Sequence, residues 1–482
     1  MISAGNKLNS SPKLWWSAPI VFIFQYFWWV FALIIVFYFP ILRIWWWFFF
    51  PIILYFFLYE IYLYWLQWDI WYKKFKWIVL EITPPKQNLR PFKAMEDIYE
   101  TLWAIIDVPK WREIYCEGEL PLGGGTWLSF EVACFGGKEI HFYARMPDFY
   151  KNTFETALYA HYPELEIKEV PDYTNNIPKD IPNEKYDVRG EDFCFLKEHC
   201  YPIKTWSAFF EEKPEVREIE VKRIDPINSM LEQMASVGPS EQFWMQIVLN
   251  PIVDCSTHNR FIPWISEGKK IAAKIARRKE EKKESALLKE IKKMFVPPSP
   301  AEIFPPEKGT VLPTEEEKIE GISPARTETG EREMIITPRE RAVLSAIEGK
   351  MSKYAFSTWI RAVYICQRDK PHNERNVRIT RTYMLHFKTA DLNAFKFWDQ
   401  TRTRIHYFFR NRRLYLRKRK LVRNFVQRFP PFWPRMEAGE GTPVLNTEEL
   451  ATIFHFPTEI ILPAVPRIEA KPGGPPPGLP VE

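Results

Sequence analysis

The stretch "TWLSFEVACFGGKEIHFYARMP", residues 126–147, determines how the rest of the chain is interpreted. Apolar and polar side chains alternate on both sides of Gly136 and Gly137. Alternation with a period of two is typical of a half-buried strand, and paired glycines suit a tight turn. The pattern predicts two antiparallel strands that form a hairpin around these glycines.

Elements of the same layer flank this hairpin. Residues 77–86 alternate like a strand that ends at Pro84, and residues 93–106 place apolar side chains at helical spacing. After the hairpin, residues 148–163 predict a helix and residues 165–173 another strand. This order predicts an α+β fold in which an antiparallel sheet carries helices on one face.

Strand and helix patterns recur further along the chain. Asp225 and Pro226 are a typical helix cap and first helical residue. The recurrences lie at residues 191–206, 225–237 and 241–252, and again at 353–368 and 378–395. They predict a duplicated ferredoxin-like α+β module.

The N-terminal part of the chain has a different composition. Residues 17–67 are almost entirely apolar or aromatic, a length that fits two membrane spans of about 20 residues each. The pattern predicts a two-helix transmembrane hairpin with spans at 19–39 and 44–66. Lysines before and after this region place both termini in the cytoplasm by the positive-inside rule.

The chain therefore divides into five predicted segments. A highly charged helix and a Pro- and Glu-rich linker separate the two α+β parts. The segments are a membrane anchor at 1–76, a cytoplasmic α+β domain at 77–264, the charged helix and linker at 265–336, a second α+β segment with a basic helix at 337–429, and a docking helix with a Pro-rich tail at 430–482.

Signatures of catalysis are missing from the sequence. It contains no phosphate-binding G-x-x-x-x-G-K-[ST], no G-x-S-x-G and no H-E-x-x-H. Its six cysteines form no C-x2-C pair, so reduced thiols are expected, without a metal site or disulfide framework. Glu131 and Glu139 fall on neighbouring predicted strands, but nothing marks them as an acid/base pair. We expect a protein that is not an enzyme and needs no cofactor.

The strongest charge feature is the basic stretch at residues 402–428. It carries eleven Lys and Arg, no acid, and interleaved aromatic residues. Basic side chains attract nucleic-acid phosphates, and aromatic rings stack on unpaired bases. Anionic lipid headgroups and an acidic partner protein are alternatives that the sequence leaves open. The candidate nucleic-acid- or lipid-binding residues are Arg402, Arg404, Arg410, Arg412, Arg413, Arg417, Lys418, Arg419, Lys420 and Arg423.

A short helix is predicted near the C-terminus, in "NTEELATIFHFPT" at residues 446–458. Asn446 or Thr447 can cap it, and acids occupy its first turn, where the helix dipole favours them. Pro457 ends it. A proline-rich passage follows.

Several motifs occur in order along the chain: "VLEITPPK" with "PFKAMEDIYETL", "SFEVACFGGKEIHFYARMP", "ETALYAHYPELEIKEVPDYT", "YPIKTW", "DPINSMLEQMASVGPSEQFWMQIVLNP" and "NTEELATIFHFPT". Together they resemble the membrane-anchored N-terminal region of bacterial conjugative, type IV secretion-like DNA-transfer ATPases. In that family the final helix and a Pro-rich passage lead into a RecA-like motor. The motor's nucleotide-binding motif is missing here, so no catalytic role carries over.

The resemblance implies a non-catalytic platform of a transfer apparatus at the bacterial inner membrane. Its expected partners are a separately encoded RecA-like ATPase and the membrane, and nucleic acid and further copies of the chain are additional candidate partners. The alternative function is a membrane-tethered nucleic-acid-binding protein that uses residues 402–428. The residues expected to dock the ATPase are Glu448, Glu449, Leu450, Phe454, His455 and Phe456.

Overall fold

The computed structural model describes two compact units of the chain. The first comprises Met1–Lys74 with Trp111–Gly118, and the second Phe75–Lys110 with Glu119–Glu482. The described residues are 61–85, 91–105, 112–119, 127–136, 139–209, 225–252, 264–276, 336–406, 408–431 and 441–457, together with 110, 465, 466 and isolated residues between 38 and 59.

The first unit contains short helical turns: η1 (Leu66–Trp71), η2 (Tyr72–Lys74) and η3 (Glu113–Glu117). Gly118 ends η3 with a φ of 79°. A Cβ at this glycine would lie 2.4 Å from Leu66 Cγ, so the close approach of η3 to η1 requires glycine here.

The predicted two-helix transmembrane hairpin is contradicted. In the described part of the chain, no helix combines the length and the apolar character needed to cross a membrane. Tyr38 is the one described residue of the predicted first span, and the second span is described only in part. Much of that described part is Tyr and Trp, whose polar OH and NH groups make them less apolar than the aliphatic residues that spans need.

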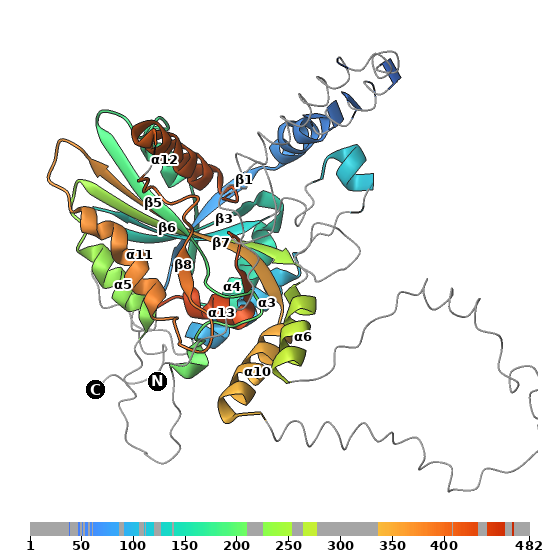
Figure 1. The fold of residues 1–482 in the computed structure, drawn as a ribbon. Helices are drawn as coiled ribbons and strands as arrows, with labels where there is room; N and C mark the ends of the chain where they lie inside the picture. Colours follow the sequence, from blue (N-terminus) through green and yellow to red (C-terminus); the bar gives the residue numbers. More distant parts are fainter. Residues whose placement is uncertain are drawn as a thin grey trace, which may run out of the picture. The chain divides into compact units, whose positions relative to one another are not determined.

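The second unit is built on one antiparallel sheet of nine strands (Figure 1). Their order is β4-β1-β3-β2-β6-β7-β5-β8, with β9 also paired to β7. The strands are β1 (Trp77–Thr83), β2 (Leu128–Phe135), β3 (Glu139–Pro147), β4 (Glu166–Val170), β5 (Tyr186–Phe195), β6 (Glu241–Ile252), β7 (Ala355–Gln367), β8 (Phe395–Phe397) and β9 (Val444–Asn446).

The sheet consists of two similar halves. In the first, β1, α3 (Pro91–Trp103), β2, β3, α4 (Lys151–His161) and β4 follow one another, and the strands lie in the order β4-β1-β3-β2. In the second, β5, α5 (Pro226–Ala235), β6, β7, α11 (Ile379–Leu385) and β8 repeat this order in reverse across the sheet. Each half has the β-α-β-β-α-β order of a ferredoxin-like unit, and the pairing of β2 with β6 joins them.

The α+β class and the antiparallel sheet therefore agree with the prediction. The strand and helix patterns at residues 191–252 and 353–395, which the sequence analysis placed in separate segments, together form the second ferredoxin-like half of the sheet. β6 and β7 form the longest ladder, from Glu241 opposite Cys366 to Ile252 opposite Ala355. Sequence analysis assigns these strands to different segments. Pairing between residues so distant in the sequence leaves no local signal.

Helices cover both faces of the sheet. One face packs against α3, α4, α5, α11 and α13 (Thr447–Ile453) in the larger apolar core. The other face packs against α12 (Arg410–Gln427), which contributes Leu421, Val422 and Phe425 to a second core. Figure 1 shows α12 apart from α5 and α11, which lie together.

The remaining elements are short or peripheral. α6 (Trp264–Ile275) is the described part of the predicted charged helix, and it packs against α10 (Pro338–Met351). A capping box between Thr337 and Glu340 begins α10. Most of the predicted linker lies outside the described residues. The 3-10 turns are η5 (Asp148–Tyr150), η6 (Tyr173–Asn176), η7 (Trp206–Ala208) and η9 (Glu374–Arg378).

Candidate nucleic-acid interface

Helix α12 runs through the predicted basic stretch and is bounded by two unusual backbone conformations. Phe409 precedes it with a φ of 57°, and Arg428 follows it with a φ of 56°. Residues other than glycine rarely adopt this left-handed region because the Cβ crowds the backbone. Each end of α12 therefore carries a conformational cost, which contacts of the buried Arg428 offset at the C-terminal end.

The inner side of α12 is apolar and lies close to the sheet. Leu421 and Phe425, four residues apart, point to the same side of the helix. The ring of Phe425 packs 5.5 Å from that of Trp244 on β6. A Cβ at Gly190 on β5 would lie 2.6 Å from Leu421 Cδ2, so glycine at this position permits the close approach of helix and strand.

The outer side of α12 is basic and exposed. We call Arg410, Arg412, Arg413, Arg419 and Arg423 the basic face, because all five are exposed. Phe408 and Phe409 are 86% and 78% exposed at the start of the helix, and Tyr415 is 43% exposed among the arginines. No acidic side chain in the described part of the chain pairs with Arg410 or Arg412. This surface presents concentrated positive charge beside accessible aromatic rings.

Four of the other predicted binding residues contact other parts of the fold or are partly buried. Lys418 Nζ lies 2.5 Å from Asp187 Oδ1 on β5. Arg417 donates to the backbone carbonyls of Asp399 and Arg402, at 3.1 and 3.0 Å. Arg402 Nε lies 3.7 Å from Glu191 Oε2. Lys420 is partly buried, and burial, helped by the charge of Arg423, lowers its pKa. Arg404, the last of the ten, is exposed in the loop before α12.

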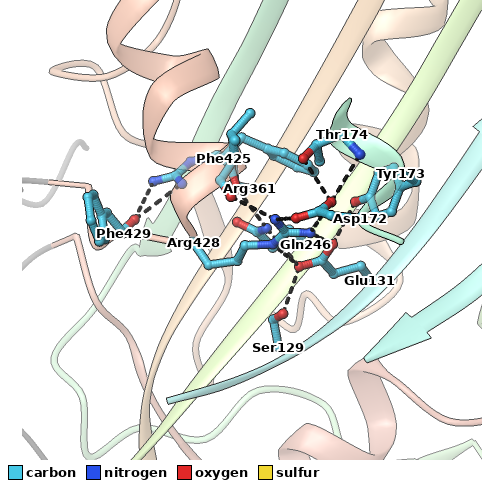
Figure 2. A network of polar contacts seen from close by, with 11 residues as sticks. Ser129, Glu131, Asp172, Tyr173, Thr174, Gln246, Arg361, Phe425, Arg428 and Phe429 are labelled. Carbon is cyan, nitrogen blue, oxygen red and sulfur yellow. Dashed lines mark hydrogen bonds and ion pairs between the residues drawn. The ribbon is translucent and has the colours of Figure 1, made fainter. Parts of the chain in front are cut away.

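A buried ion-pair network holds the C-terminal end of α12 against the sheet (Figure 2). The guanidinium of Arg428 is fully buried, and its Nε and Nη2 lie 2.9 and 3.0 Å from the two oxygens of Glu131. Its Nη2 also donates to Asp172 Oδ1 at 3.1 Å. Two parallel hydrogen bonds between guanidinium and carboxylate form the strongest geometry for this pair. The network therefore fixes where α12 ends.

Neutral donors complete the coordination of Glu131. The hydroxyls of Ser129 and Tyr173 donate to its carboxylate at 2.7 and 2.6 Å. Gln246 Nε2 donates both to Glu131 Oε1 at 2.9 Å and to the carbonyl of Phe425 at 3.2 Å. A buried carboxylate with this many donors is well satisfied.

A second buried arginine, Arg361 on β7, supports the residues after the helix. Its Nε lies 2.6 Å from Asp192 Oδ1, and both terminal nitrogens donate to the carbonyl of Phe429 at 3.3 Å. Figure 2 shows Arg361 reaching Phe429 beside the Arg428 cluster. The chain leaving α12 is thus held at two consecutive positions.

The electrostatics of the network favour ionised carboxylates. Burial alone would raise the pKa of Glu131, but the charge of Arg428 and hydrogen bonds from Arg428, Tyr173 and Ser129 bring that pKa below its ordinary value. The pKa of Asp172 is lowered in the same way, against burial, by Arg428 and Thr174. Carboxylates held ionised by an arginine act as structural counterions. The sequence signal was a glutamate within an apolar strand, and its partner lies far away along the chain.

The residues predicted to dock a partner lie mainly in the core. Glu449, Leu450, Phe454, His455 and Phe456 are buried. Asn446 caps α13 through a capping box with Glu449. Lys350 Nζ lies 3.0 Å from Glu449 Oε2, and His455 Nε2 lies 2.8 Å from Asp225 Oδ1. Glu448, partly exposed, pairs with Lys353 at 2.9 Å. In this structure these side chains hold α13 within its own fold.

Across the residues that the structure describes, no group of three or more His, Cys, Asp and Glu side chains is placed to hold a metal ion.

Comparisons with known proteins add a family assignment. No curated protein matches the chain. A family model described as "Domain of unknown function (DUF8128)" matches residues 79–461, which span the sheet, α12 and α13. The chain belongs to this family.

Proposed function

We propose that the protein is a non-catalytic nucleic-acid-binding protein that uses the basic face of α12. The observation that carries this proposal is the two-sided character of α12. Its buried residues pack against the sheet, while its basic face is exposed. Residues 402–428 contain no acidic side chain. Arginines in such an arrangement release counterions when they contact phosphates, which supplies salt-dependent affinity.

The exposed aromatic residues favour nucleic acid among anionic partners. Phe408 and Phe409 place two large apolar rings in water directly before the arginines. Stacking of an aromatic side chain on an unpaired base contributes about 1–3 kcal/mol per base and tolerates any sequence. The combination of charge and rings therefore fits an unpaired, flexible strand, whose bases are free to stack.

The proposal is tested by fluorescence anisotropy with a labelled oligothymidylate over a series of salt concentrations. The triple variant Arg410→Gln, Arg412→Gln and Arg413→Gln should weaken binding by at least tenfold. The plot of the logarithm of the binding constant against the logarithm of the salt concentration should also become less steep. Its slope should change by about 0.7 for each phosphate of the single strand that an arginine no longer neutralises. The matched control changes Lys269, Lys270 and Lys274, three exposed lysines of α6, to Gln. An equal fall in affinity in both variants would overturn the proposal.

Anionic lipid is the competing partner, and a second arm separates it. Vesicles containing phosphatidylserine attract the same arginines, because the charge interaction is shared. Binding to these vesicles without binding to the oligonucleotide contradicts nucleic-acid recognition.

A role as the platform for a separately encoded RecA-like ATPase, and a location at the bacterial inner membrane, stay predictions from the resemblance.

A further inference from the structure

A second group of arginines lies at the opposite edge of the sheet from β4, next to β8. Arg381 on α11 and Arg402 in the loop after β8 both lie over the ring of Phe397, with their guanidinium carbons 4.0 and 4.9 Å from the ring centre. Stacking on an aromatic ring orients a planar guanidinium and leaves its edge available to hydrogen-bond acceptors. Phe397 therefore holds the side chains of Arg381 and Arg402 close to each other beside β8.

That place also contains Glu191 of β5. Arg381 Nη2 and Arg402 Nε each lie 3.7 Å from Glu191 Oε2. This separation exceeds that of an N–H···O hydrogen bond. Glu191 Oε1 and Arg381 Nε are both buried atoms without a hydrogen-bond partner in the described part of the chain. Glu191 thus attracts the two guanidiniums without satisfying their donors.

The charges around Glu191 are unequal. Burial lowers the pKa of Arg381, and the negative charge of Glu191 raises it. The positive charges of Arg402, Arg378 and Arg404 lower this pKa further. Burial raises the pKa of Glu191 to about 7, even though Arg381 and Arg402 lower it, and the charge of Asp192 adds to the rise. Asp192 is itself paired with Arg361. Arg381 and Arg402 therefore face a single carboxylate that is only partly ionised near neutral pH, and Arg378 and Arg404 add positive charge beside Arg381.

We propose that Arg378, Arg381, Arg402 and Arg404 form a binding site for a phosphate group. A phosphate offers several acceptor oxygens, which match the paired donors of a guanidinium better than the distant Glu191 carboxylate does. The site uses β5, β8, α11 and the loop after β8, and it does not require the basic face of α12. Its ligand is a single phosphate, either free or part of a larger molecule.

The test is thermal unfolding in inorganic phosphate compared with chloride at equal ionic strength. A ligand that binds only the folded state raises the Tm, so phosphate at millimolar concentration should raise the wild-type Tm by a few degrees. The exposed Arg378 allows a variant that leaves the packing around Phe397 intact. Arg378→Gln and Arg402→Gln should each lose at least half of the shift, whereas Arg412→Gln on the basic face should keep it. No shift in the wild type, or an equal shift in all variants, overturns the site.

Glu191 gives an independent measurement with sulfate, whose charge is constant between pH 6 and 8. Ionisation of Glu191 introduces a competing negative charge, so sulfate affinity of the wild type should fall several-fold as the pH rises through about 7. Glu191→Gln should bind sulfate with little pH dependence and more tightly at pH 8. A steep pH dependence that persists in Glu191→Gln contradicts the assignment.

Competition separates free phosphate from a phosphate within a nucleic acid. If oligothymidylate removes the phosphate-induced shift, the phosphate of a strand occupies the site; if it does not, the site takes a free phosphate or a small phosphorylated molecule. Both outcomes support the site and assign its source. A protein that binds oligothymidylate through α12 but shows no phosphate shift overturns this site alone and leaves the proposed function standing.

Discussion

Arg428 and Arg412 belong to the same basic stretch but lie in opposite environments. Arg428 is fully buried and bonded to Glu131 and Asp172. Arg412 is exposed and has no acidic partner in the described part of the chain. One guanidinium is part of the folded core, and the other is available to a ligand.

This difference shows that the number of arginines in a stretch of sequence does not predict how many of them are exposed for binding. Lys418 and Arg417 contact β5 and the loop before α12, so they orient the helix. Arg412, Arg419 and Arg423 lie on the side of α12 opposite Leu421 and Phe425. Arg410 and Arg413 are exposed because they precede Lys418, the first buried residue of the helix. The buried cations position the helix, and the exposed ones face outward as a consequence.

Replacing Arg428 should have the largest effect. Arg428→Met leaves the buried Glu131 and the half-buried Asp172 without their cation, and removing one partner of a buried ion pair costs about 3–5 kcal/mol. Urea unfolding measures the free energy of unfolding directly. Arg412→Met, with the same loss of charge on the exposed side, should change it by less than about 0.5 kcal/mol. Equal effects of the two substitutions would remove the distinction between the two environments.

Acid should weaken the buried network next. The pKa values of Glu131 and Asp172 are lowered in the folded protein, from ordinary values of 4.5 and 3.8. Their contribution is therefore fully present above those ordinary values and is lost as the pH falls through the folded-state values. The free energy of unfolding should therefore fall as the pH is lowered through this range. Urea unfolding between pH 7 and 3 tests this, and Glu131→Gln should show a shallower decline than the wild type.

Phe409 offers a smaller change with the opposite sign. Its φ of 57° is strained for a residue with a Cβ, so Phe409→Gly should relieve strain and stabilise the fold by about 1 kcal/mol. If the ring stacks on bases, the same variant should bind oligothymidylate more weakly. Thermal unfolding and anisotropy measure the two effects. A variant that is more stable and binds equally well would exclude a role for this ring.

The basic face should contribute least to stability. The triple variant of Arg410, Arg412 and Arg413 removes like charges from the first turn of α12, where the helix dipole disfavours cations. We expect a small gain in the free energy of unfolding, under about 1 kcal/mol, measured by urea unfolding. A clear loss of stability would mean that these arginines have a structural role, like Arg428.

Local pattern was sufficient for most of the second unit's elements. The alternation around Gly136 and Gly137 predicts β2 and β3, and the caps at Asp225 and Asn446 begin α5 and α13 as expected. The predicted transmembrane hairpin is contradicted, because no helix in the described part of the chain is long and apolar enough to cross a membrane. The α13 side chains proposed for docking are buried because α13 packs against α3. The sequence pattern of α13 alone does not predict this contact.

The sequence by itself determined the strands and helices of the duplicated α+β unit and the concentration of basic residues at 402–428. These features depend on periodicity and composition, which neighbouring residues encode. Only the tertiary structure decided that β2 pairs with β6, that Arg428 meets Glu131, and that Arg381 and Arg402 meet at Glu191. Whether a charge is buried or exposed depends on packing between distant segments, and that information lies in no single stretch of the chain.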